Sequence, residues 1–161
     1  MTVTRPYLGP ALLLGVLTAC TAQQPAPPAF EDTDPCTLLA AGDAGALSGT
    51  PARTERACDY PFDSLRARLT LETGEFADAS QELLAGGGYG AVIGDRPMTR
   101  RCDVDSGGDE SGEVTCDAVV EVRDGQLIRL KVVQRSHDAN AVGQVTQSLA
   151  GKALGRVPVT S

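Results

Sequence analysis

Two neighbouring segments of largely alternating polarity constrain the fold more than any other part of the chain. They span residues 114–122 and 126–134, and Asp124-Gly125 lies between them. Successive side chains of a β-strand point to opposite faces, so this alternation predicts two strands with one buried face each. The short connection with Asp-Gly predicts that the two strands form an antiparallel hairpin.

The length of the connecting loop decides which residues of this hairpin lie opposite each other. A two-residue turn would place Val120 opposite Arg129, whereas a three-residue loop, 123–125, places Val120 opposite Ile128. Because a slip of one residue exchanges the two faces of a strand, we predict the second register. It requires Gly125 in a left-handed conformation that closes a bulge. The other expected pairs are Ala118 with Leu130, Cys116 with Val132 and Asp117 with Lys131.

The remaining segments predict an α+β domain with helices packed on an antiparallel sheet of about five strands. Asp34 and Pro35 are of the types found at an N-cap and a first helical position, and Asp138 is of the type that caps a last helix. The expected helices begin at residue 35, span 76–84 and span 139–154. The other expected strands are 55–60, 65–71 and 97–102, and the pattern leaves 89–93 open between strand and loop.

Two packing details follow from the same patterns. A four-residue loop between the first two strands would pair Tyr60 with Leu65 and Cys58 with Ala67, with all four side chains on one face. The last helix is expected to bury one face at helical spacing. That face comprises Ala141, Val142, Val145, Leu149 and Ala153.

The first twenty residues have the organisation of an export signal. Arg5 is followed by a mostly apolar run over 7–17, which ends in the tetrapeptide LTAC at 17–20. A positive region, an apolar region and a small-residue cleavage site follow one another, and the tetrapeptide is similar to the lipobox of bacterial lipoproteins. The apolar run is far shorter than the roughly 20 residues that a membrane-spanning helix needs. We therefore predict cleavage before Cys20 and lipid on its thiol, with an ordinary secretory signal as the alternative.

This processing predicts three parts of the chain. Residues 1–19 are the lipoprotein signal peptide, 20–33 are the lipidated Cys and a Pro/Gln-rich tether, and 34–161 are a single extracytoplasmic domain. Two acyl chains, such as a diacylglyceryl group with palmitate, hold a protein stably at a membrane. The expected location is the extracytoplasmic face of the cell membrane. The expected partners are that membrane, the lipoprotein-processing enzymes, and an unknown envelope protein or small ligand.

The charge of the chain excludes one large class of partner. The formal net charge is -7, and removal of residues 1–19 takes away Arg5 alone among charged residues, which makes it -8. An acidic exterior of this kind argues against binding to nucleic acid. Trp is absent, which argues against aromatic platforms for sugars or single-stranded bases.

Four cysteines remain once Cys20 is assigned to lipid. An even number in an exported chain predicts disulfides, and four cysteines allow three connectivities. We predict Cys36–Cys58 and Cys102–Cys116, because each bond closes a short loop. The alternative is a four-cysteine zinc site, which the absence of any C-x-x-C spacing disfavours.

An acidic loop supplies the candidate metal site. Asp103, Asp105 and Asp109 partly match the spacing of a calcium loop. The third acidic position of such a loop is Gly107 here, and the position of the bidentate Glu is Val114. A solvated acidic loop without metal is therefore the favoured interpretation, and calcium binding is the alternative.

The sequence shows no catalytic constellation and predicts no cofactor. His137 is the single histidine, and Ser136 and Asp138 flank it. Sequence neighbours rarely adopt triad geometry, so a hydrolase that uses Asp/Glu residues and His137 is only the alternative to a non-catalytic binding module. The glycine-rich segment 86–90 follows a helix rather than a strand, unlike a dinucleotide-binding fingerprint. The pair Arg100-Arg101 predicts a cross-strand or loop ion pair.

In this order, the motifs resemble a family of actinobacterial lipoproteins defined only by a domain of unknown function. The resemblance rests on Cys20, the Pro/Gln tether, Asp34-Pro35-Cys36, Cys58-x-Tyr60, the pair Cys102 and Cys116, the final hairpin and the last helix. It covers about residues 34–158, and Trp is common in the family where this chain has Tyr60. The resemblance implies an envelope location and a disulfide-braced domain. It implies no catalytic residues.

The lipid anchor leads to a direct test. The substitution Cys20→Ala removes the thiol that would carry lipid, so we expect loss of incorporated palmitate and release from the membrane fraction. Cell fractionation after growth with labelled palmitate measures both effects. Unchanged fractionation of the variant would contradict the lipoprotein interpretation.

Overall fold

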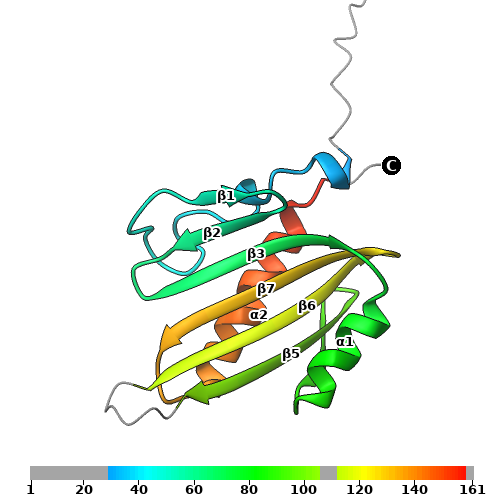
Figure 1. Cartoon of the computed structure of the whole chain (residues 1–161). Helices are drawn as coiled ribbons and strands as arrows, with labels where there is room; N and C mark the ends of the chain where they lie inside the picture. Colours follow the sequence, from blue (N-terminus) through cyan, green and yellow to red (C-terminus); the bar gives the residue numbers. More distant parts are fainter. Residues whose placement is uncertain (1–28, 106–111, 159–161) are drawn as a thin grey trace, which may run out of the picture.

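One antiparallel sheet organises the part of the chain that the structure describes, residues 29–105 and 112–158. In this computed structural model, seven strands follow one another in the order β1-β2-β3-β7-β6-β5-β4 (Figure 1). The strands are β1 (Ala52–Thr54), β2 (Ala57–Pro61), β3 (Leu65–Thr73), β4 (Tyr89–Ile93), β5 (Arg96–Asp105), β6 (Glu113–Arg123) and β7 (Gln126–Arg135). Two α-helices, α1 (Phe76–Ala85) and α2 (Ala139–Arg156), and two short 3-10 helices, η1 (Phe30–Asp32) and η2 (Pro35–Thr37), complete the described residues.

The α+β class is as predicted, but the sheet has seven strands rather than about five. The two additional strands, β1 and β4, are its edges. All three residues of β1 are exposed, and β4 buries none of its five residues fully. Neither segment therefore carries the apolar alternation by which a half-buried strand is recognised in a sequence.

The sheet has two different faces. The inner face carries the main core and is covered by α2, which crosses behind the strands in Figure 1, and by residues 30–47. The outer face carries α1 over one part of the sheet, where Ala79 and Leu83 pack on Val119 and Leu127. Each fully buried Leu, Ile or Val contributes about 1.5–3 kcal/mol, so the inner face dominates stability. Its largest fully buried residues include Tyr60, Leu69, Leu71, Met98, Ile128, Leu130 and Leu149.

The register predicted for the β6–β7 hairpin is confirmed. Val120 lies opposite Ile128, Ala118 opposite Leu130, Cys116 opposite Val132 and Asp117 opposite Lys131. Gly125 has a φ of +74°, as the turn requires. The loop has two residues, Asp124 and Gly125, rather than the three expected, because Arg123 pairs with Gln126. The irregularity lies between Glu121 and Arg123, and Arg123 still pairs with Gln126, so the strand absorbs the extra residue just before the turn.

The register predicted between the first two long strands is wrong by two residues. Tyr60 lies opposite Ala67 rather than Leu65, and Cys58 lies opposite Leu69. Strand β2 continues through Pro61 because the next residue, Phe62, lies in the core. Phe62 is 3% exposed and forms an isolated β-bridge with Leu47. A shift of two residues preserves the alternation, so the predicted inner-face residues remain on the inner face.

The predicted helices are present with changed bounds. Asp34 caps η2 through a hydrogen bond from the Cys36 amide at 2.9 Å, but this helix is a single 3-10 turn. The Asp138 side chain caps α2 by accepting hydrogen bonds from two amides, as predicted. Ala141 was expected on the buried side of α2 and is exposed instead. The buried residues of α2 are Val142, Gly143, Thr146, Leu149, Ala150 and Ala153.

Both predicted disulfides are present in the structure. Cys36–Cys58 joins η2 to β2, with a Cα–Cα distance of 5.1 Å. Cys102–Cys116 joins directly opposite residues of β5 and β6, with a Cα–Cα distance of 4.0 Å. The first bond fixes the N-terminal segment to the sheet, and the second fixes the strands that flank the acidic loop.

The folded part begins before the expected boundary at residue 34. Phe30 is 5% exposed within the main core, and the Arg56 guanidinium lies 5.4 Å from the centre of its ring. Arg56 also donates hydrogen bonds to the Phe30 and Glu31 carbonyl oxygens. Residues 30–33 therefore pack against the domain and do not belong to an extended tether.

Candidate functional site

The outer face of the sheet is covered over only part of its area. Helix α1 packs against β4, β5 and β6. The outer side chains of β2, β3 and the far part of β7 lie beyond it, and Figure 1 shows α1 at one end of the sheet, away from β1 and β2. Among the described residues, no helix lies over this second part. We call it the open face.

The open face contains a groove with a volume of about 510 Å3. Its apolar lining includes Ala52 on β1, Pro61 on β2 and Val133 on β7. These residues come together because β3 lies between β2 and β7 in the sheet, although 52–61 and 133 are far apart in the sequence.

Basic side chains line the same groove. Arg66 and Arg68 point outward from β3, and Lys131 points outward from β7, opposite Arg68. Asp59 also lines the groove and accepts two hydrogen bonds from Arg68, at 2.8 and 3.0 Å. Arg66 lies 3.6 Å from Glu113. The aliphatic stems of the long cations extend the apolar surface, while their charged ends reach the rim.

The open face is not among the sites that the sequence predicted. Its residues appear in the sequence as ordinary polar positions of alternating strands, which usually form a solvated face. These positions can be recognised only from the order of the strands in the sheet. Arg66 and Arg68 alternate with apolar residues along β3, and β3 pairs with β7. That pairing joins segments about 60 residues apart, and no local pattern reveals it.

Cys20 and residue Asp109 of the candidate calcium loop lie outside the described residues. Asp103 and Asp105 are exposed at the end of β5, and Asp103 pairs with Arg101 at 2.9 Å. Among the residues that the structure describes, no group of three or more His, Cys, Asp or Glu side chains could hold a metal ion. Calcium binding by the full loop stays a prediction.

His137 is exposed at the junction of β7 and α2. Its Nε2 accepts a hydrogen bond from the Gly112 amide at 3.5 Å, and the Asp138 carboxylate caps α2. Ser136 Oγ accepts a hydrogen bond from the Asp138 amide. The alternative in which His137 acts in a hydrolase stays a prediction.

The remaining sequence candidates are Arg100, Arg101 and the glycine-rich segment 86–90. Arg101 forms the predicted ion pair, with Asp103. Arg100 does not: it is 6% exposed on the inner face, and its guanidinium lies 4.8 Å from the centre of the Tyr89 ring. The segment 86–88 links α1 to β4, and a Cβ at Gly88 would lie 2.7 Å from the Leu83 carbonyl oxygen. Close packing accounts for this glycine without a bound phosphate.

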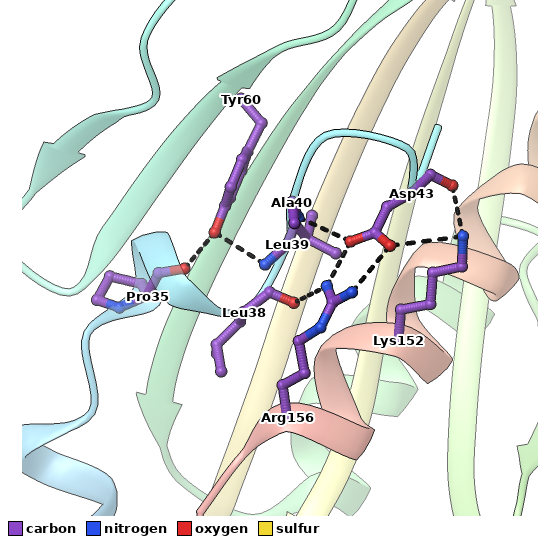
Figure 2. A network of polar contacts seen from close by, with 8 residues as sticks. All are labelled: Pro35, Leu38, Leu39, Ala40, Asp43, Tyr60, Lys152 and Arg156. Carbon is purple, nitrogen blue, oxygen red and sulfur yellow. Dashed lines mark hydrogen bonds and ion pairs between the residues drawn. The ribbon is translucent and has the colours of Figure 1, made fainter. Parts of the chain in front are cut away.

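A polar network fixes the segment before β1 to the end of α2 (Figure 2). Both terminal nitrogens of Arg156 donate to the Asp43 carboxylate, and one also donates to the Leu38 carbonyl oxygen at 3.0 Å. The Ala40 amide donates to the same carboxylate at 2.7 Å, and Lys152 donates to the Asp43 carbonyl oxygen at 2.7 Å. The hydrogen bonds from Arg156 hold the pKa of Asp43 below its usual value, although burial opposes this shift.

Tyr60 fixes the same segment from the sheet side. Its hydroxyl group donates to the Pro35 carbonyl oxygen and accepts a hydrogen bond from the Leu39 amide at 3.1 Å. Burial raises the pKa of this phenol, which is 1% exposed, so it remains a donor at ordinary pH. Figure 2 shows Tyr60 and Arg156 approaching the segment from β2 and α2. The network therefore ties the N-terminal segment to both layers of the fold.

No protein-family model and no curated protein matches this chain. The resemblance to actinobacterial lipoproteins stays a prediction. No helix of the described ranges, 29–105 and 112–158, is long and apolar enough to cross a membrane.

The Asp43 network leads to a pH-dependent test. A carboxylate whose pKa is lowered in the folded state stabilises the fold above its unfolded pKa of about 3.9, and this contribution is lost as the pH falls through the folded value. We expect Asp43→Asn to lower the free energy of unfolding at pH 7 by about 1–2 kcal/mol. The difference from the wild type should shrink below about pH 4.

Denaturant unfolding between pH 7 and pH 2 measures this difference. Asp124→Asn in the exposed hairpin turn is the matched control, and we expect it to be nearly silent. A difference between Asp43→Asn and the wild type that stays constant down to pH 2 would contradict the role assigned to the ionised carboxylate.

Proposed function

We propose that the chain is a lipid-anchored extracytoplasmic binding module that holds a small, mainly apolar ligand with an anionic group on the open face. The observation that carries the proposal is the groove of about 510 Å3 on an otherwise polar sheet surface. Sites for small ligands typically have volumes of roughly 300–1,000 Å3 and are lined mainly by apolar groups with a few polar ones.

The composition of the groove supports this class of ligand. Ala52, Pro61 and Val133 offer apolar contact, whereas Arg66 and Lys131 offer positive charge at the rim. The chain as a whole has a formal charge of -7, so a basic rim is a local departure from its general character. An anionic group on the ligand would gain from these cations, and an apolar body would gain from leaving water.

The anchor and the fold support an extracytoplasmic binding role together. The lipobox-like segment with Cys20 predicts attachment to the membrane, and two disulfides are typical of an oxidising compartment. The Cys36–Cys58 bond ties β2, a strand that lines the groove, to η2. A covalent tie of this kind reduces the conformational entropy that the site loses on binding.

A fluorescent fatty acid tests the proposal. The mature chain from Thr21, made without lipid, is titrated with dansyl-labelled undecanoic acid and with the corresponding alcohol. We expect saturable binding of the acid, weakened at least about tenfold by Val133→Asp, since a loss of about 1.4 kcal/mol corresponds to that factor. Lys131→Gln should weaken binding of the acid but leave binding of the alcohol unchanged.

Val104→Asp is the matched control for this titration. Val104 is also a strand valine, 42% exposed, and it does not line the groove. It should bind the acid as the wild type does. Binding that is unaffected by Val133→Asp, or no saturable binding of the acid, would contradict the proposal.

A further inference from the structure

Arg100 is the one buried charged residue of the described core, and its position is not explained by packing. Its side chain is 6% exposed, and Nε and Nη1 are buried without a hydrogen-bond partner. The Tyr89 ring, which is 45% exposed, lies over the guanidinium. A buried guanidinium without an anionic partner destabilises a fold. Arg100 therefore lowers the stability of the domain, and the cation–π contact with Tyr89 offsets this loss only in part.

The neighbouring helix leaves room for this cation. Gly143 lies on the buried side of α2, and a Cβ at this position would lie 2.7 Å from Nη1 of Arg100. Glycine within a helix costs about 1 kcal/mol relative to alanine. Two unfavourable residues, a buried Arg and a helical Gly, are therefore combined at one point between α2 and the sheet.

A crevice between β4 and α2 begins at Gln144, the residue that follows Gly143 on the helix. Tyr89 and Arg100 are directly opposite in the β4–β5 ladder, and further along the same strand Ile93 lies against Gly151 of α2. The crevice has a volume of about 530 Å3, and Gln144, Gln147 and Ser148 of α2 line it. The helix thus runs along β4, from the Tyr89 end to the Ile93 end.

Strand β4 also offers a free row of main-chain groups. It is the last strand of the sheet, and among the described residues it pairs with β5 alone. Val92, its fourth residue, is 65% exposed. An edge strand beside a helix groove is a known mode of peptide recognition, in which an extended segment adds to the sheet and side chains enter the groove.

We propose that an extended peptide adds as a strand to β4 and that its terminal carboxylate binds Arg100. Nε and Nη1, the two donors without a partner, lie on different edges of the guanidinium, so the carboxylate binds through its charge and a hydrogen bond from one of them. The exposed Tyr89 ring moves aside to uncover Nε and Nη1. Residues on α2 such as Gln147 then contact the peptide side chains in the crevice. This site is on the opposite side of the sheet from the groove and does not depend on it.

Bead-bound random pentapeptides are the probe for this site. One library has free carboxyl ends, and the matched library has amidated ends. We expect the lipidated chain, in non-ionic detergent, to be retained by the free-carboxyl beads at least about tenfold more than by the amidated beads, as loss of a charged hydrogen-bonded pair implies. Arg100→Met should abolish this preference, Arg100→Lys should reduce it, and the groove variant Lys131→Gln should leave it intact.

The melting temperature separates a binding role from a structural one. Because Nε and Nη1 are buried without a hydrogen-bond partner, we expect Arg100→Met to melt at the same temperature as the wild type or higher. A lower melting temperature would assign Arg100 to the core and overturn the proposal. Equal retention on both libraries, dependence on Lys131 instead of Arg100, or complete displacement by millimolar acetate would overturn it as well.

Discussion

The register of the three central strands, β3, β7 and β6, determines the rest of this structure. Antiparallel pairing sets Leu69 beside Leu130 and Leu130 beside Ala118, so the inner face is a continuous apolar layer. A slip of one residue in either ladder would place a row of charged residues against α2. The bulge after Glu121 allows the hairpin to keep this register through its turn.

The same register creates the open face. Every strand position that does not point into the core points outward, and α1 covers only the part of the sheet formed by β4, β5, β6 and the first residues of β7. Arg68 and Lys131 thereby lie directly opposite each other, and Val133 lies between Arg66 of β3 and Thr115 of β6. The groove follows from sheet order and from the short length of α1, and it needs no dedicated loop.

The periphery depends on polar contacts more than on apolar area. The segment before β1 is fixed by the Cys36–Cys58 bond, by the hydrogen bonds of Tyr60 and by the Arg156–Asp43 ion pair. Asp43 has a side chain only 8% exposed, so its charge is balanced by Arg156 and not by water. This arrangement holds the point where the chain enters the domain, at Phe30, beside the end of α2.

How far the sequence predicted this fold depends on the range of the interactions. The β6–β7 register, the Asp138 cap and both disulfides were predictable because local alternation, capping chemistry and short loops determine them. Strands β1 and β4 were not predictable, because these edge strands bury too few side chains to produce a recognisable alternation of apolar and polar residues. The register predicted for β2 and β3 was wrong by two residues because Phe62 lies in the core, where it pairs with Leu47. The sequence of the hairpin does not reveal this contact. The groove required the pairing of Arg66 with Val133 across the sheet.

The claim that the open face is the binding surface can be tested at the level of single methyl groups. The mature chain, with 13C-labelled valine methyl groups, is titrated with dodecanoate and followed by NMR. The methyl signals of Val133 should shift most, while those of the buried neighbour Val132 should shift little. Shifts confined to residues away from the groove, such as Val104, or no shifts at saturating dodecanoate, would contradict the account.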